Sequence, residues 1–174
     1  MTITLEDFAT ECKHLLEAKP GNDGRQDVAT VLQDVLKDEA FVSKHLGDDT
    51  GARKVLYEDP DLGFTILAHR YEDASESKPH DHGPSWAIYG QARGETEMAT
   101  WELVEAATPE KPGKVRKAGV SVLKPGMATV YNEGQLHSPR REGPTRLIRI
   151  EGMNMDRVKR LPYEAVDAVS TAAE

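Results

Sequence analysis

The sequence predicts a mainly β protein in which an antiparallel barrel follows two amphipathic helices. Short runs rich in Val, Ile, Leu, Thr, Tyr and Trp fill about residues 53–151, and clusters of Gly, Pro, Asp and Asn separate them. Such a pattern is typical of antiparallel strands and their turns. Before these runs, apolar residues recur at helical spacing over residues 4–18 and about 25–46. A length of 174 residues suits one structural domain overall, with a single core.

Both N-terminal segments carry sequence signals that mark the ends of a helix, at the start, at the finish or at both. In residues 4–18 acidic side chains come early, and Pro20-Gly21 stops the pattern. In residues 25–46 the apolar positions keep helical spacing until Gly47-Asp48-Asp49 closes the segment. We therefore expect residues 1–50 to form two helices that pack on the barrel.

Seven runs in the rest of the chain are expected to form strands. They are KVLYE, FTILAHRY, SWAIYGQ, ETEMATWEL, VSVL, ATVY and TRLIRIE. The stretch 106–113 has two prolines and mixed charges, which predicts a hairpin loop rather than a domain linker. Residues 51–155 would then form the barrel, and residues 156–174 a tail with a short C-terminal helix and no evident chemistry.

Composition and charge narrow the class of protein. Hydrophobic residues make up 38% of the chain and charged residues 30%, which is typical of a globular protein. No apolar run approaches a transmembrane length, and the N-terminus lacks the pattern of a secretory signal, so we expect a cytoplasmic protein without a membrane partner. A net charge of -8 repels phosphate backbones, so we expect a small-molecule partner and no nucleic acid. A homodimer remains open.

The histidines offer the clearest chemistry. The only cysteine is Cys12, so the chain has no internal disulfide and no cysteine-rich zinc site. His80 and His82 are separated by one residue at the start of a strand-like segment, where side chains at i and i+2 project to the same face. His137 is the third candidate, because the segment KPGMATVYNEGQ before it returns the chain to the barrel. Neutral imidazole is a common metal ligand, so these residues predict a three-histidine metal site. The alternative is that His-Asp-His forms a polar turn.

These motifs resemble those of a known superfamily. The segment PHDHGPSWAIYGQARGETE resembles the first cupin motif, in which His-x-His precedes a strand and a glycine, here Gly94, at the next turn. Gly119, Pro125, Gly126 and His137 resemble the second motif. More narrowly, the run HDHGPSWAIYG is similar to bacterial thiol dioxygenases of the cysteine dioxygenase type, over about residues 50–155. The resemblance implies a cupin double-stranded β-helix, also called a jelly-roll barrel.

The resemblance also implies a cofactor and a reaction. Thiol dioxygenases hold a mononuclear iron on three histidines, which implies Fe(II) on His80, His82 and His137, with Zn, Ni or Mn as alternatives. An arginine before the first motif binds the substrate carboxylate, and Arg53 occupies the matching place. The implied enzyme is a non-heme iron dioxygenase that oxidises a small anionic substrate, a thiol carboxylic acid above all, with dioxygen.

The chain departs from these families at several positions. Where the general cupin pattern has a glutamate, this sequence has Trp86 and Ala87, and the cysteine that some relatives crosslink to tyrosine is absent near the first motif. Arg149 and Glu151 stand where thiol dioxygenases carry the His and Tyr of a Ser-His-Tyr relay. These two share one face of a strand, either lining the pocket, where Arg149 is a second candidate clamp, or on the outer face. Tyr89 and the two tryptophans are expected to pack in the barrel.

Two other functions therefore stay open. A cupin dioxygenase that cleaves a diketone or related enolate uses the same three histidines without the relay. A non-redox metal cupin, either an isomerase or a ligand-binding module, would need neither the relay nor dioxygen, and a fold alone does not decide among these activities.

Overall fold

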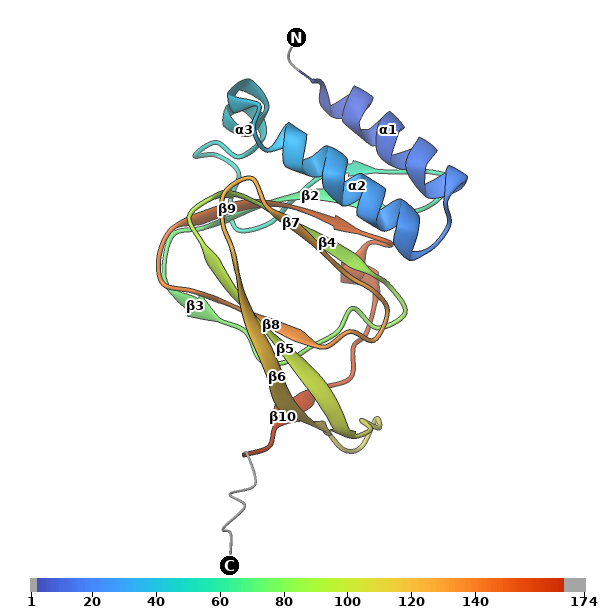
Figure 1. Ribbon diagram of the computed structural model, residues 1–174, viewed down its shortest axis with the longest axis vertical. Coiled ribbons are helices and arrows are strands. Elements are labelled where there is room, and N and C mark those ends of the chain that lie inside the picture. Colours follow the sequence, from blue (N-terminus) through green and yellow to red (C-terminus); the bar gives the residue numbers. More distant parts are fainter. Residues whose placement is uncertain (1–2, 168–174) are drawn as a thin grey trace, which may run out of the picture.

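The computed structural model describes residues 3–167 and places helices outside a pair of facing five-stranded sheets (Figure 1). The first sheet has the strand order β1-β2-β9-β4-β7, and the second has the order β10-β6-β5-β8-β3. In the first sheet the strands are β1 (Lys54–Glu58), β2 (Thr65–Tyr71), β9 (Thr145–Glu151), β4 (Ala87–Arg93) and β7 (Ala128–Tyr131). In the second they are β10 (Tyr163–Ala165), β6 (Gly113–Leu123), β5 (Thr96–Glu105), β8 (His137–Arg141) and β3 (Ser75–Glu76).

The connectivity is that of a double-stranded β-helix. Apart from the β1–β2 and β5–β6 hairpins, the chain passes from one sheet to the other at each step, and every pairing except that of β10 with β6 is antiparallel. The chain is therefore mainly β, with a jelly-roll barrel behind N-terminal helices, as the sequence predicts.

The helices agree with the sequence in part. Helix α1 (Leu5–Ala18) begins at Thr4, whose hydroxyl accepts a hydrogen bond from the Asp7 amide at 3.1 Å. The single helix predicted over 25–46 is wrong, because the segment forms α2 (Asn22–Val35) and α3 (Glu39–His45). The Asp38 carboxylate accepts hydrogen bonds from the amides of Ala40 and Phe41. This cap begins α3 and separates it from α2.

The main hydrophobic core lies between the helices and the outer face of the first sheet (Figure 1). Leu32 of α2 packs so close to β4 that a Cβ atom added to Gly90 would lie 2.6 Å from its Cδ2 atom. Glycine at this position therefore allows the helix to approach the strand. The strands contribute alternate residues to this core, namely Ile66, Ala68, Ile88, Ile148 and Ile150.

All seven predicted strands are present, and β5 and β6 flank the predicted hairpin loop. The expectation of a strand from His80 is wrong, because β4 begins only at Ala87 and a turn follows His82, whose carbonyl accepts from the Ser85 amide. The predicted C-terminal helix is absent from the described residues, which form the 3-10 helix η1 (Met155–Arg157) and then β10. Positions 168–174 lie outside the described residues. No helix between residues 3 and 167 is long and apolar enough to cross a membrane.

Candidate metal centre and adjoining cavity

The structure brings the three predicted histidines together. His80 and His137 form an isolated antiparallel bridge, in which each amide donates to the other residue's carbonyl at 3.0 and 2.9 Å. The ring of His82 stacks on that of His137, with centroids 5.2 Å apart and planes inclined by 14°. One nitrogen from each ring lies within 4.8 Å of one nitrogen from both others. Three imidazoles at this separation fit a single metal ion.

Backbone carbonyls fix the orientation of two of these rings. The Nδ1 of His80 lies 2.8 Å from the Lys78 carbonyl, and the Nδ1 of His137 lies 2.9 Å from the Gln135 carbonyl. A carbonyl only accepts, so each Nδ1 carries the proton and each Nε2 presents a lone pair to a metal. The Nδ1 of His82 is buried and has no hydrogen-bond partner among the described residues. The donor set thus fits a metal that binds nitrogen ligands.

Burial keeps the three histidines neutral. Desolvation lowers the pKa of His80 to about 4, although its bond to the Lys78 carbonyl acts in the opposite direction. Desolvation, and then the neighbouring imidazole of the cluster, lowers the pKa of His137 to about 3 and that of His82 to about 2. At neutral pH all three rings are therefore in the uncharged form that binds metal ions.

Tyr89 is a fourth residue of this cluster, for which the sequence predicted only packing in the barrel. Its hydroxyl lies 3.1 Å from the Nε2 of both His82 and His137, and the side chain is buried on β4. Because the Nε2 of His137 carries no proton, Tyr89 donates to it and accepts from the Nε2 of His82. The expectation of barrel packing is met by the ring, but it missed the hydroxyl. The available signal was a hydroxyl-bearing aromatic on the strand that follows the His-x-His motif.

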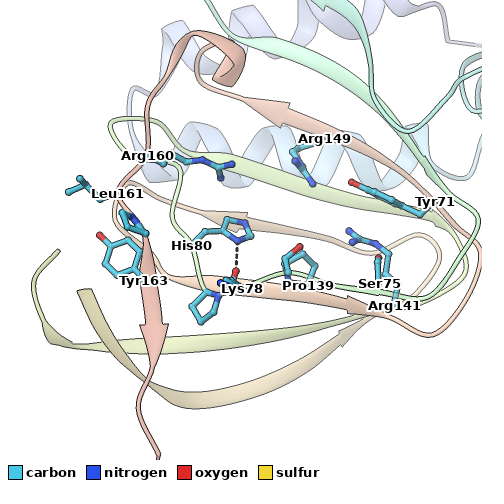
Figure 2. Close-up of a pocket in the computed structure, with 13 residues that line it drawn as sticks. Tyr71, Ser75, Lys78, His80, Pro139, Arg141, Arg149, Arg160, Leu161 and Tyr163 are labelled. Carbon is cyan, nitrogen blue, oxygen red and sulfur yellow. Dashed lines mark hydrogen bonds between the residues drawn. The ribbon is translucent and has the colours of Figure 1, made fainter. Parts of the chain in front are cut away.

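A cavity of about 500 Å³ opens beside the cluster, between the two sheets (Figure 2). Of the three histidines, His80 lines it, whereas His82 and His137 do not. Figure 2 shows Arg149, Tyr71 and Arg141 on one side of His80 and Arg160, Leu161 and Tyr163 on the other. The lining consists of Tyr71, Ser75, Ser77, Lys78, Pro79, His80, Pro139, Arg141, Arg149, Arg160, Leu161, Pro162 and Tyr163.

The Arg149 and Glu151 pair faces the interior of the barrel, which was one of the two alternatives. Arg149 lines the cavity, and its Nη1 lies 3.5 Å from the Oε1 of Glu151, which is 2% exposed. The guanidinium of Arg149 also lies 4.4 Å from the centroid of the Tyr89 ring. Arg149 therefore connects the histidine cluster with the cavity.

Arg53 lies elsewhere. Its Nη1 is 2.6 Å from the Oδ2 of Asp156, and its Nη2 is 3.8 Å from the Oε2 of Glu151. The side chain does not line the cavity. The substrate-clamp role that the resemblance implies for Arg53 stays a prediction, and its position instead favours holding the Glu151 carboxylate.

Arg141 is a second residue that sequence reasoning missed. It is 3% exposed, its guanidinium lies 4.1 Å from the Tyr71 ring centroid, and its Nε and Nη2 atoms have no partner among the described residues. Burial lowers the pKa of this guanidinium, and the nearby charge of Arg149 acts in the same direction. A sequence signal did exist, because residues 137, 139 and 141 share one face of a strand. Strand β8 itself was not predicted, since it contains Pro139 and two arginines.

The C-terminal segment also contributes to the cavity, although the sequence suggested no chemistry there. Arg160 donates to the Asp81 carbonyl at 3.2 Å, and the Tyr163 hydroxyl lies 3.5 Å from the Asp81 carboxylate. Asp81 separates two of the histidines, and its carboxylate also accepts from the Gly83 amide at 3.0 Å. Residues 160–163 therefore brace the loop that carries His80 and His82.

No protein-family model and no curated protein matches the chain. Solved structures do match, at low identity, and several are described as cupin or double-stranded β-helix proteins. A double-stranded β-helix protein from Klebsiella pneumoniae is 16% identical, with a TM-score of 0.48 over 71% of this chain and 89% of that one. KdgF from Halomonas sp. is 18% identical, with a TM-score of 0.45 over 61% and 83%. A cupin superfamily protein from Desulfitobacterium hafniense is 11% identical, with a TM-score of 0.42 over 59% and 76%. Likenesses this weak do not assign the chain to a family.

Proposed function

We propose that the protein is a cupin-type, iron-dependent dioxygenase that oxidises a small anionic thiol carboxylic acid. The observation that carries the proposal is the convergence of three neutral histidines, two buried and one half-buried, beside a cavity lined by arginine side chains. Three neutral ligands leave the full positive charge of a divalent ion uncompensated, which favours an anionic substrate. The arginines favour the same class of molecule.

The chain's own residues would divide the work as follows. His80, His82 and His137 hold the metal, which when bound supplies coordination positions and redox chemistry for the substrate and dioxygen. Arg149 binds the substrate carboxylate, since it lies between the cavity and the Tyr89 ring. The walls of the barrel exclude bulk water from the reacting groups.

The first test measures the metal and the reaction together. Freshly purified protein is analysed for metal content, beside His82→Ala and the control His14→Ala, which alters an exposed histidine of α1. Oxygen consumption is then followed with cysteine, 3-mercaptopropionate and mercaptosuccinate. We expect iron in the parent and in the control, loss of iron from His82→Ala, and oxygen uptake with one thiol acid.

Other outcomes would overturn this proposal in distinct ways. Zinc or nickel without oxygen uptake indicates a non-redox isomerase or ligand-binding cupin. Absence of metal from both the parent and the control removes the basis of the proposal.

A second candidate is a dioxygenase that cleaves a diketone or related enolate. It is favoured by Arg149 and Glu151, which occupy the interior positions where thiol dioxygenases carry the His and Tyr of their relay. The discriminating measurement is mass spectrometry of the product. A sulfinate supports the thiol dioxygenase, whereas fragments of a broken carbon chain support enolate cleavage.

A further inference from the structure

We propose that the cavity binds a substrate with two acidic groups, one held by Arg141 and the other by Arg149. The two arginines come from different sheets, Arg141 from β8 and Arg149 from β9, and both side chains line the cavity. This inference rests on the proposed metal-dependent function, because it names the substrate class of the same site.

Arg141 is a buried cation without an anionic partner among the described residues. Its side chain is buried, and its Nε and Nη2 atoms have no hydrogen-bond partner among residues 3–167. A buried charge without a partner is costly, so natural structures retain one where a ligand or a reaction requires it. These two unpaired nitrogens are themselves buried, and together they form one edge of the guanidinium, whose shape matches the two oxygens of a carboxylate.

The Tyr71 ring restrains the orientation of the Arg141 guanidinium. The guanidinium carbon lies 4.1 Å from the ring centroid, which is the distance of a cation–π contact. Stacking on the ring restricts rotation of the guanidinium without using its nitrogens. Figure 2 shows Arg141, Tyr71 and Arg149 next to one another along one side of the cavity.

Arg149, unlike Arg141, already has a carboxylate of the protein nearby. The two arginines therefore need separate acidic groups from the ligand. The Nη1 of Arg149 has the Glu151 carboxylate at 3.5 Å, a carboxylate that Arg53 also approaches at 3.8 Å. One negative charge is thus shared between two guanidiniums, and the Nε of Arg149 has no partner among the described residues. A monocarboxylate bound to Arg149 alone would leave Arg141 without its counter-ion.

The charge of the whole lining agrees with a dianion. The cavity wall contains four cationic side chains, Lys78, Arg141, Arg149 and Arg160, and no carboxylate. The chain as a whole carries a net charge of -8, so this concentration of positive charge runs against its average composition. A volume of about 500 Å³ is within the range of sites for small metabolites. The substrate class is therefore a small dicarboxylic acid that also carries a donor for the metal.

The test measures binding without turnover, on zinc-loaded protein. Succinate and butyrate serve as probes, because they have the same carbon chain and differ by one carboxylate. We expect calorimetry to show binding of succinate at least about tenfold tighter than that of butyrate. Arg141→Met and Arg149→Met should each abolish this preference. Arg141→Lys should retain only part of it, because an ammonium keeps the charge but loses the two-nitrogen edge.

Arg140→Met is the matched control. Arg140 is the neighbour of Arg141 in sequence, but its side chain is half exposed, pairs with Glu142 and is absent from the cavity wall. This variant should keep the preference for succinate unchanged. Circular dichroism spectra verify that each variant is folded before its binding is compared.

Two results would overturn the inference. One is equal binding of succinate and butyrate by the parent protein, and the other is a succinate preference that survives in Arg141→Met. Failure of the proposed function would look different. A succinate preference that requires both arginines, in a protein that consumes no oxygen with any thiol acid, would retain the dianion site and reject the dioxygenase.

Discussion

The two faces of the first sheet differ in chemistry. On the face toward the helices, Ile148 and its neighbours pack into a continuous hydrocarbon core. On the face toward the barrel interior, the next residue along β9 is Arg149, which lies in register with Leu67 on β2 and Tyr89 on β4. The interior holds a much smaller apolar cluster, made of Ala87, Tyr89, Met98, Leu123 and Tyr131.

The contrast shows how the molecule separates stability from chemistry. The helices cover one face of the sheet and bury most of the apolar surface, which is the dominant favourable term in folding. The interior can then hold arginines, histidines and a buried glutamate that stabilise the fold little or oppose it. Truncating an apolar residue on the helix face should therefore destabilise the fold, whereas removing the unpaired charge of Arg141 from the interior should stabilise it.

The largest effect is expected on the helix side. Ile148→Ala should lower the free energy of unfolding by about 2–5 kcal/mol, because it leaves a cavity in the core between helix and sheet. Chemical denaturation measures this change, and Ile148→Val serves as the control with a loss of about 0.5–1.5 kcal/mol. Zinc affinity should stay that of the parent, and a large fall in affinity would mean that the two faces are not independent.

For Arg141, on the interior side, the sign should reverse. Arg141→Met removes a buried charge that lacks a partner, so it should raise the free energy of unfolding by about 1–3 kcal/mol in ligand-free protein. Arg140→Met, on the exposed neighbour, should change it by less than about 0.5 kcal/mol. Destabilisation by Arg141→Met would show that this arginine is structural, against the contrast between the two faces.

The Tyr89 hydroxyl should stabilise only the metal-free form. Tyr89→Phe leaves the Nε2 atoms of His82 and His137 without a partner, at a cost of about 1–3 kcal/mol in the free energy of unfolding. Saturating zinc should remove most of that difference, because the metal then satisfies the nitrogens. Tyr131→Phe is the control, since the Tyr131 ring stacks on His137 at 4.0 Å. If zinc leaves the Tyr89→Phe difference unchanged, the hydroxyl does not contact the metal-binding nitrogens.

The histidine cluster also gives the metal-free protein a dependence on pH. The cluster histidines have folded-state pKa values of about 4 or lower, against an ordinary value of 6.5, so the unfolded state binds protons first. The stability of metal-free protein should therefore be full above about pH 6.5 and fall as the pH drops toward 4. Thermal melts across this range measure the trend, and His80→Gln should make it shallower without abolishing it, because His82 and His137 still contribute. An unchanged melting temperature down to pH 4.5 would contradict the burial of these rings.

Local sequence patterns predicted the strands whose residues form the two faces of the first sheet. The run TRLIRIE matches the bounds of β9, and alternation along it indicated that Arg149 and Glu151 share a face. Short spacing in the chain also predicted that His80 and His82 belong together. These features depend on neighbours in sequence, which is the information that a pattern contains.

The sequence by itself determined the mainly β class and the positions of seven strands. It also identified the three histidines that lie together in the fold. Only the tertiary structure decided that β9 turns Arg149 inward, that Arg141 from the other sheet lines the same cavity, and that Tyr89 contacts two of the histidines. It also decided that residues 160–163 brace the histidine loop. The reason is physical: a period of two says which side chains share a face, but which face is buried, and what lies opposite, depends on the pairing and closure of strands far apart in the chain.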